Sequence, residues 1–276
     1  MSISDIFDNF KKRTAKPQKI YISYASNKGK VRARNEDDLY IDGLGSRAKE
    51  NMSGDRTLFT SDSYVFAVCD GMGGEQFGDE AAAIASDTIA HHSAELREAP
   101  PGKLHDAVND LATEANNRIT SMVYAKRANL SGSTLVLAVL HNTTVYVFNL
   151  GDSRAYYYSD GKIKQITYDH TVANMKVKAN IFTEEEAKNS SDSHRLTSFL
   201  GVDDRWIGIK AQAYEPFDIS GGALLLCSDG LFDMCTDEEI AEVMADESEG
   251  CAQRLVEIAL ENGGRDNITC MIIKTA

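Results

Sequence analysis

Apolar residues along the chain change their spacing twice, and these changes divide it into helical and extended stretches. In residues 75–97, and again in residues 104–123, apolar side chains recur every three or four positions, which is the spacing of an amphipathic helix. Pro100 and Pro101 separate the two stretches. The pattern therefore predicts two long helices that pair as an antiparallel layer.

Beyond the second helix the pattern becomes alternating or continuously apolar, which is typical of strands. Residues 134–140 and 144–150 are joined by a hairpin-sized connection, and residues 155–158 meet 162–166 across Asp160-Gly161, a favoured hairpin pair. Residues 43–63 are polar and aperiodic, so we expect a loop there. Further strands are predicted at residues 20–24, 39–42, 65–69, 207–213, 223–228 and 268–274, and further helices at 236–245 and 249–261.

The number of apolar strands decides the predicted architecture. They are too many for one sheet with a solvated face, so we expect an α+β fold. Its two antiparallel sheets pack face to face with a helix pair outside each, as a four-layer α-β-β-α sandwich. Only four prolines and no Gly/Ser-rich tract interrupt the chain, which favours a lead-in at 1–19 and one domain at 20–276. The polar excursion at 169–200, with a capping-box pattern at Thr183 and Glu186, is expected to be a flap.

Composition limits the classes of binding partner and the compartment that we expect for this protein. The net charge of −13 and the pI near 4.9 argue against binding to nucleic acid or to an anionic membrane. The five cysteines show no CxxC pairing, which favours a reducing compartment. No run reaches the roughly 18 apolar residues of a membrane span, and the amino terminus lacks the apolar core of a signal peptide. We therefore expect a cytoplasmic protein.

Carboxylates at predicted strand ends are the candidate chemistry. Asp70 and Asp229 each end an apolar run and precede a glycine, and Asp266 comes just before the last strand. An acidic cluster at residues 35–38 precedes another strand. One Asp-Gly pair is usually only a turn, but acids from several strand ends that converge on one edge of a sheet require a cation. Ligands that are all oxygen suit Mg²⁺ or Mn²⁺ better than Zn²⁺.

Other polar features have an ordinary interpretation beside a functional one. For residues 151–154, Gly-Asp-Ser-Arg, a tight turn with an Asp–Arg pair is favoured over a nucleophilic serine, because no GxSxG motif accompanies it. His91 and His92 are expected on a solvated helix face. His170 is either structural or a proton shuttle. Arg32 or Arg34 is either part of a solvated basic loop or a phosphate ligand, since guanidinium binds phosphate in a bidentate manner.

Six motifs in order resemble the bacterial branch of the PP2C-type metal-dependent protein phosphatases, over about residues 20–274. They are Gly29-x-x-Arg32-x-x-Asn35-Glu36-Asp37, Asp70-Gly71-Met72-Gly73-Gly74, Ser131-Gly132-Ser133-Thr134, Gly151-Asp152-Ser153-Arg154, Ser228-Asp229-Gly230-Leu231 and Gly264-Arg265-Asp266-Asn267.

The resemblance implies a protein serine/threonine phosphatase in which a water bridging two Mg²⁺ or Mn²⁺ ions attacks phosphoserine or phosphothreonine in proteins. By this likeness Asp70 bridges both ions. The Gly71 carbonyl and the Glu36/Asp37 pair serve one ion, Asp229 and Asp266 serve the other, and Arg32 holds the phosphate. The implied partners are phosphorylated proteins and a cognate serine/threonine kinase, and we expect a monomer.

Two departures from the family pattern stand out. Met72 occupies a position where many relatives have His, so the leaving group must be protonated from elsewhere, with His170 as one candidate. Asn129 occupies a position where relatives often have an Asp for a third metal, which leaves a third ion uncertain. The alternatives are a phosphatase-like regulatory module, which would be expected to lose a metal carboxylate, and a phosphodiesterase, which would usually show histidine ligands.

Overall fold

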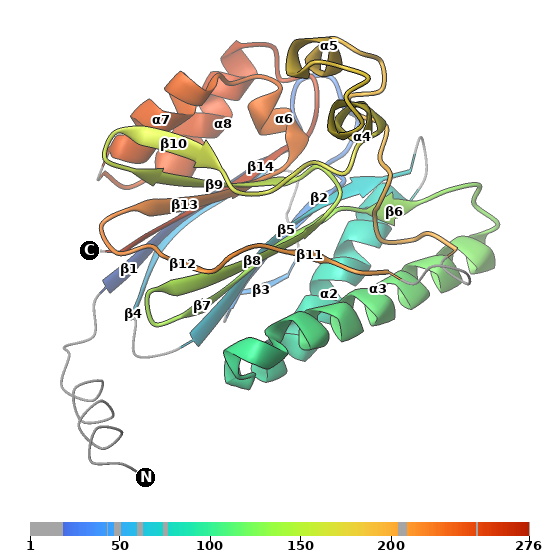
Figure 1. Ribbon diagram of the computed structural model, residues 1–276, viewed down its shortest axis with the longest axis horizontal. Coiled ribbons are helices and arrows are strands. Elements are labelled where there is room, and N and C mark those ends of the chain that lie inside the picture. Colours follow the sequence, from blue (N-terminus) through green and yellow to red (C-terminus); the bar gives the residue numbers. More distant parts are fainter. Residues whose placement is uncertain are drawn as a thin grey trace.

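The computed structural model describes residues 19–42, 44–46, 51–59, 63–73, 77–203, 209–246 and 248–275. Its described residues form two antiparallel sheets that pack face to face, with a helix pair on each outer face (Figure 1). This is the predicted α-β-β-α sandwich. The lead-in predicted at 1–19 lies outside the described residues except for Lys19.

The first sheet contains both the first and the last strand of the described chain. Its spatial order is β10 (Lys162–Gln165), β9 (Arg154–Ser159), β13 (Ala223–Cys227), β14 (Ile268–Thr275), β1 (Lys19–Asn27) and β4 (Asn51–Phe59). The outer helices of this sheet are α7 (Asp237–Ala245) and α8 (Cys251–Glu261). Strand β14 therefore lies between β13 and β1 and pairs with both.

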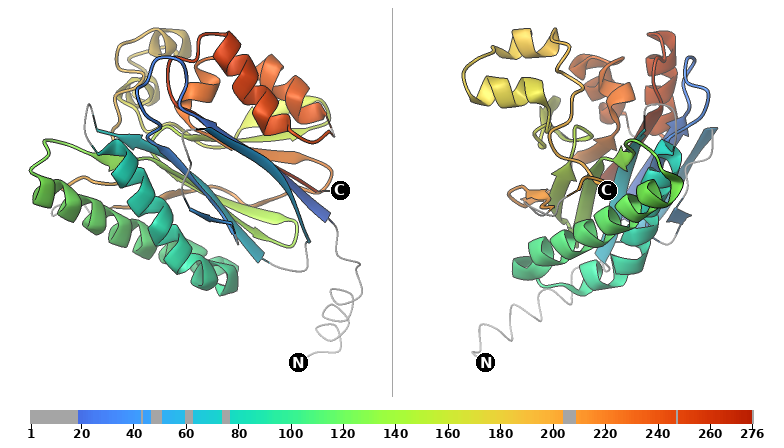
Figure 2. Two further views of the ribbon diagram at one scale, coloured as in Figure 1. Left: turned by 180° about the vertical axis from the view of Figure 1, so that it is seen from behind. Right: turned by 90° about the vertical axis from the view of Figure 1, so that its right-hand side faces the viewer.

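The second sheet is built around the strand that carries Asp70. Its order is β11 (Gln212–Ala213), β8 (Thr144–Leu150), β7 (Leu135–His141), β5 (Ser63–Met72), β2 (Asp37–Ile41) and β3 (Gly45–Ser46), with β12 (Phe217–Asp218) beside β8 and β6 (Gly132–Ser133) beside β5. Its outer helices are α2 (Gly78–Glu98) and α3 (Leu104–Lys126), joined by the short 3₁₀ helix Pro101–Lys103. Figure 2 shows this helix pair side by side along the sheet.

Burial on both faces explains the unbroken apolar runs. In β5, Val65, Ala67 and Cys69 pack against the outer helices, whereas Phe66 and Val68 pack between the sheets. Successive side chains of a strand point to opposite faces, so a strand covered on both sides needs apolar residues at every position. All five cysteines of the chain are buried and free. None of the described helices is long and apolar enough to cross a lipid bilayer.

The two predicted hairpins form with their turns as expected. Strands β7 and β8 are joined through Asn142 and Thr143, and β9 and β10 through Asp160 and Gly161. Three of these four residues, Asn142, Asp160 and Gly161, have positive φ, at 58°, 50° and 75° respectively. That conformation is accessible to Asn, Asp and Gly at little cost, and it suits the twist of a two-residue hairpin.

The loop predicted at 43–63 is wrong for most of the residues in this range that the structure describes; residues 43, 47–50 and 60–62 lie outside the described part. Residues 51–59 form β4, a nine-residue edge strand, and residues 45–46 form the short β3. Side chains of β4 alternate between exposed and half-buried, because this strand lies at the edge of the sheet. Polar residues suffice at such a position, so hydrophobic periodicity gave no signal. The strand predicted at 207–213 is also too long: residues 207–208 lie outside the described part of the chain, and of residues 209–213 only β11 is a strand.

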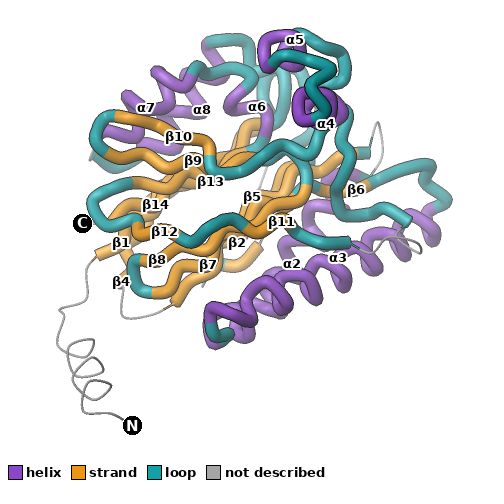
Figure 3. Tube along the Cα trace, in the orientation of Figure 1, coloured by secondary structure: helices purple, strands orange, loops and turns teal. Residues whose placement is uncertain are grey.

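Residues 169–200, which we call the flap, leave the body after β10 and carry two short helices, α4 (Val172–Lys178) and α5 (Glu184–Lys188). In Figure 3 the flap helices stand among long loop segments at the same end of the sandwich as α6 (Asp229–Phe232). The capping box predicted at Thr183 and Glu186 is confirmed, because each residue's side chain accepts a hydrogen bond from the other's backbone N–H. Helices α4 and α6 were not predicted.

Candidate metal centre

Asp37 and Asp70 face each other in register at the ends of two neighbouring strands, β2 and β5. Asp37 is buried, and its Oδ2 accepts a hydrogen bond of 2.8 Å from the Ser228 hydroxyl. Its Oδ1 is also buried, and no group in the described part of the chain donates to it. Burial, together with the charges of Asp229 and Asp266, raises the pKa of Asp37 to about 7, although hydroxyl donors oppose the shift. A buried carboxylate oxygen with no donor is a site that a cation can complete.

Asp70 is held by its backbone rather than by a counter-charge. Its N–H donates to the Thr134 hydroxyl at 3.0 Å, and its carbonyl accepts from the Thr134 N–H at 2.8 Å. Burial raises the pKa of Asp70 well above its usual range, and the charges of Asp37, Asp229 and Asp152 raise it further. The protein alone therefore disfavours two ionised carboxylates here, and a cation would reverse that preference.

The Glu36 carboxylate and the Gly71 carbonyl approach the same point at the start of α2. A Cβ added to Gly78 would lie 3.1 Å from Glu36 Oε1 and 3.0 Å from the Gly71 oxygen. At Gly71 itself, a Cβ would lie 2.3 Å from the Glu36 carbonyl oxygen, so only glycine fits there. One oxygen thus comes from the residue that precedes β2 and the other from β5, and both lie beside Gly78, which has no side chain.

Asp229 and Asp266 come from the other sheet. Asp229 is the first residue of α6 and is separated from the end of β13 by Ser228, and Asp266 lies two residues before β14. Both charges act on Asp37 and on Asp70, which places all four carboxyl groups in one electrostatic cluster. The convergence predicted from strand ends is therefore what the structure shows.

Arg32 lies on the rim of this cluster. Its Nη2 is 2.5 Å from Asp266 Oδ2, and its side chain is half exposed. Burial lowers the pKa of Arg32, but the hydrogen bond to Asp266 and the charges of Asp229 and Glu36 outweigh it, so the pKa is raised. Arg34 instead points to Asp79, with 3.6 Å between Nη1 and Oδ2.

Asn267 fastens the Arg32 loop to the start of β14. Its side-chain amide donates to the carbonyls of Lys28 and Arg34 at 2.9 Å each, and its oxygen accepts from the Glu36 N–H at 2.8 Å. One buried side chain therefore places both Arg32 and Glu36 relative to Asp266.

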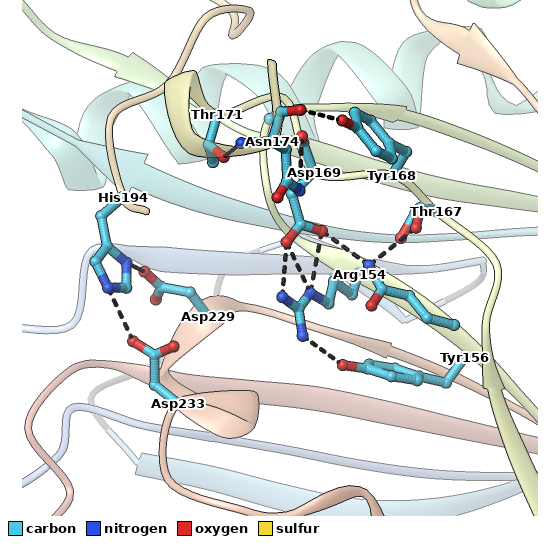
Figure 4. Close-up of polar contacts among 12 residues, drawn as sticks. Arg154, Tyr156, Thr167, Tyr168, Asp169, Thr171, Asn174, His194, Asp229 and Asp233 are labelled. Atoms are coloured by element: carbon cyan, nitrogen blue, oxygen red, sulfur yellow. Dashed lines mark hydrogen bonds and ion pairs between the residues drawn. The ribbon is translucent and has the colours of Figure 1, made fainter. Parts of the chain in front are cut away.

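A second group of possible ligands was not anticipated. Ligand atoms of Asp152, His194 and Asp229 all lie within 4.8 Å of one another. His194 belongs to the flap, and its ring nitrogens lie 3.6 Å from Asp229 and 3.6 Å from Asp233 (Figure 4). Hydrogen bonding to Asp229 raises the pKa of His194 to about 9. The spacing of Asp229 and Asp233, one helical turn apart, was the available signal for Asp233, whereas nothing in the sequence pointed to His194.

The sequence predicted an Asp–Arg pair within residues 151–154, and this is wrong, because Arg154 does not pair with Asp152. The Arg154 guanidinium binds Asp169 instead, with Nε 3.0 Å from Oδ1 and Nη2 2.7 Å from Oδ2. Asp152 turns away from this pair, toward the carboxylate cluster. It is 6% exposed, and burial together with the charge of Asp229 raises its pKa well above the usual range.

His170 is a structural residue. Its Nδ1 accepts from the Gly151 N–H at 3.2 Å, and its Nε2 lies 2.9 Å from the Gln212 side-chain oxygen. An amide oxygen only accepts, so Nε2 carries the proton and both ring nitrogens are engaged. Of the two interpretations left open by the sequence, the structural one fits this geometry.

Asn129 is exposed in the loop between α3 and β6. Within the described residues, no hydrogen bond or ion pair joins it to the carboxylate cluster. Met72 is half-buried, and its carbonyl accepts from the Ser131 hydroxyl at 3.3 Å. Neither residue supplies a ligand or a proton donor in this arrangement.

The donor set fits a hard divalent cation. The candidate ligands around Asp70 are carboxylates and one backbone carbonyl, which Mg²⁺ and Mn²⁺ prefer. The unpartnered Oδ1 of Asp37 marks the place where protein donors are missing. Carboxylates that repel one another in the protein alone become complementary once a cation lies between them.

Comparison with known proteins identifies the family. Residues 41–262 match the family model described as protein phosphatase 2C. The chain belongs to the protein phosphatase 2C family. Among curated relatives, the serine/threonine protein phosphatase PstP of Mycobacterium tuberculosis is 32% identical over 255 residues, which cover 90% of this chain and 43% of that protein. The chain thus spans less than half the length of PstP. The serine/threonine phosphatase stp of Listeria monocytogenes is 28% identical over 92% of this chain and 96% of its own length.

Solved structures agree with this membership. The crystal structure of M. tuberculosis PstP superposes with a TM-score of 0.74 at 28% identity, covering 92% of this chain and 98% of that one. A PstP catalytic domain solved with two manganese ions gives a TM-score of 0.73 at 28% identity, covering 94% and 99% of the two chains. Phosphatases of this family thus share the present fold, and one of them holds a pair of manganese ions.

Proposed function

We propose that this protein hydrolyses phosphoserine and phosphothreonine in proteins, using two Mg²⁺ or Mn²⁺ ions at the carboxylate cluster. The observation that carries the proposal is the buried Asp37 Oδ1 without a donor, in a site where Asp70, Asp229 and Asp266 also converge. Membership of the phosphatase 2C family and the manganese pair of one relative support the same chemistry.

Each candidate ligand has a place in this scheme. Asp70 lies at the centre of the cluster and would contact both ions. Glu36, Asp37 and the Gly71 carbonyl would hold one ion, and Asp229 with Asp266 would hold the other. When bound, two such cations would lower the pKa of a water and stabilise the charge that develops during displacement at phosphorus.

Arg32 would bind the phosphate. In the protein alone its guanidinium is occupied by Asp266, at 2.5 Å. A cation on Asp266 would weaken that ion pair and leave the guanidinium free to bind a phosphate dianion in a bidentate manner. Because the side chain is half exposed, it can reach substrate at the rim of the site.

A third ion would be held by Asp152, His194 and Asp229 rather than at Asn129. Asp152 and Asp229 belong to the body, and His194 belongs to the flap. The imidazole nitrogen would make this position more tolerant of Mn²⁺ than of Mg²⁺, which prefers oxygen ligands.

The partners we propose are phosphorylated proteins and the serine/threonine kinase that produces them. We place the protein in the cytoplasm, which the five free cysteines support. Arg32 and the metal centre recognise only the phosphate, so selection among phosphoproteins would fall to the surrounding surface.

The test is a panel of phosphoserine, phosphothreonine and phosphotyrosine peptides, assayed with Mn²⁺, with Mg²⁺ and with excess EDTA. We expect release of phosphate from the first two classes with either cation and none in EDTA. Full activity in EDTA would refute the proposal. Manganese binding without turnover of any peptide would favour the regulatory module instead.

A further inference from the structure

Arg154 lies between the base of the flap and helix α6, which carries Asp229, and it contacts both. The edge of its guanidinium binds Asp169, the first residue of the flap, through two nitrogens. One face of the guanidinium covers the ring of Phe232, the last residue of α6, at 3.6 Å from the ring centroid. A single side chain therefore touches two segments that are far apart in the sequence.

The flap side of this contact is firmly built. The Asp169 side chain is only 9% exposed, and it also accepts a hydrogen bond of 2.9 Å from the Gln165 amide. Its backbone carbonyl accepts from the Thr171 N–H at 2.9 Å, just before α4. A displacement of Asp169 would therefore displace the start of the first flap helix.

On the α6 side, only a short stretch of chain separates the residue that Arg154 contacts from Asp229. Phe232 and Asp229 are three positions apart in a four-residue helix, so they lie on neighbouring positions of one helical turn. Asp229 would ligate a metal. A shift of the Phe232 ring would therefore move the Asp229 carboxylate. At a separate place, His194 of the flap approaches Asp229 and Asp233 at 3.6 Å. The flap and α6 thus meet at two points.

The types of contact make Arg154 hard to replace. A bidentate guanidinium–carboxylate pair fixes orientation as well as distance, and stacking on an aromatic face adds a cation–π attraction. Lysine keeps the charge but has neither the planar fork nor the stacking face. The Tyr156 hydroxyl accepts from the third guanidinium nitrogen at 2.8 Å, which completes the set.

We propose that Arg154 is a positioning residue that couples the flap to the metal centre, so that the placement of the flap and the affinity for the metal at Asp229 depend on each other. The inference rests on the proposed function, because it assigns Asp229 to a metal. Coupling between two sites is reciprocal: metal binding then orders the flap, and a change at the flap base weakens metal binding. Protein substrates that contact the flap would be bound well only by the metal-loaded enzyme.

The test uses Asp169→Asn, which keeps the size of the side chain and removes its charge, and Phe232→Leu, which removes the ring from α6. Neither residue is a proposed metal ligand. We expect each variant to weaken Mn²⁺ binding, measured by calorimetry, by at least about fivefold, the lower end of ordinary coupling. Hydrogen exchange of residues 172–188 should be slowed by Mn²⁺ in the wild type and much less in either variant.

Three further variants separate coupling from loss of stability. Arg97 also faces a buried carboxylate, with 3.4 Å between its Nη1 and Asp42 Oδ2, but it belongs to α2 on the second sheet. Arg97→Lys should leave both the Mn²⁺ affinity and the hydrogen exchange of the flap unchanged. Because Asp169 and Phe232 act through one guanidinium, the double variant should lose less affinity than the product of the two single losses. Arg154→Lys should resemble the double variant.

Unchanged Mn²⁺ affinity in both single variants, or an equal loss in Arg97→Lys, would overturn the proposal. If Asp169→Asn does not fold, Phe232→Leu decides alone, through metal affinity and flap exchange. Failure of the proposed function itself looks different, since the wild type would then hydrolyse no phosphopeptide whatever the flap does.

Discussion

Arg32 and Asp266, which are separated by 234 positions in the chain, form an ion pair of 2.5 Å at the rim of the carboxylate cluster. The pair unites the proposed phosphate ligand with a proposed metal ligand. Neither can perform its task while fully engaged by the other. Metal binding and phosphate binding are therefore expected to help each other.

Replacement of Arg32 by alanine should raise KM for a phosphothreonine peptide at least as much as it lowers kcat. The guanidinium acts on the phosphate before any bond changes, so its loss weakens ground-state binding. Steady-state kinetics at saturating Mn²⁺ measures both constants. Arg34→Ala is the matched control, because Arg34 faces Asp79 and not Asp266. Equal effects of the two variants would remove the special role of Arg32.

Removal of a metal ligand should be far more damaging than removal of a neighbouring acid. Asp70→Ala or Asp229→Ala should lower kcat by several orders of magnitude, because the activation of water is lost with the metal. Asp38 is the control, since its Oδ2 accepts from the Ser86 hydroxyl at 2.6 Å on the helix side of β2. Asp38→Asn should lower the melting temperature and keep the Mn²⁺ dependence. A loss of less than about tenfold in Asp70→Ala would disprove the ligand assignment.

The metal-free protein should become less stable as pH rises from about 4 to about 7. Burial, with the nearby charges of Asp229 and Asp266, raises the folded-state pKa of Asp37 to about 7, whereas an unfolded aspartate titrates near about 3.9. Between these values the folded protein binds more protons than the unfolded chain, so the free energy of unfolding falls with pH. Melting temperatures in EDTA between pH 5 and pH 8 measure the slope.

Two variants test the origin of that slope. Asp37→Asn should make the slope shallower and raise the melting temperature in EDTA at pH 8, even though it abolishes metal-dependent turnover. The slope that remains comes from Asp70 and Asp152, because burial also raises their pKa values. Asp218 is the contrasting case, because hydrogen bonds from Ser220 hold the pKa of that carboxyl below its usual range. Asp218→Asn should leave the falling slope in place. If Asp37→Asn melted lower than the wild type at pH 8, the buried charge would not be the cause.

The third ion should depend on Asp152 and not on Asn129. Asp152→Asn removes a buried carboxylate from the group with His194 and Asp229 and should abolish the weakest Mn²⁺ binding event. Asn129→Asp should leave that event unchanged, because Asn129 is exposed in its loop. Calorimetric titrations of the two variants give the number and affinity of sites. A tighter weak site in Asn129→Asp would restore the position first suggested by family likeness.

The strands and helices that face the core could be predicted from sequence, because burial requires a recognisable pattern of apolar residues. That pattern is a continuous apolar run in a strand covered on both faces and an apolar stripe in a helix covered on one. The runs that became β5, β7, β8, β13 and β14 are apolar on both faces, and α2 and α3 each carry an apolar stripe. Strand β4 was missed because an edge strand needs few apolar residues, and only Met52 and Leu58 pack inward. Helix α6 was missed because four residues are too short for a helical period.

The carboxylates at strand ends could also be predicted, because sheet topology brings such ends together. The partners of residues 151–154 could not. Arg154 pairs with Asp169, fifteen positions away and beyond a hairpin, which leaves Asp152 to join the cluster. His194 lies 35 positions before Asp229 on an irregular segment, so no spacing rule connects them. Contacts made by a flap are set by where it packs, and that packing leaves no periodic trace.

The placement of β14 between β1 and β13 also determines when a newly synthesised chain can become active. Strand β1 leaves the ribosome before its neighbour β14 and cannot pair with it until β14 has been made. In the pair Asn27 and Ile268, the second residue is synthesised 241 residues after the first. At ordinary translation rates that delay is roughly ten to fifty seconds. Asp266 arrives with the same segment, so a nascent chain has neither a closed first sheet nor all of the proposed metal ligands until β14 is released.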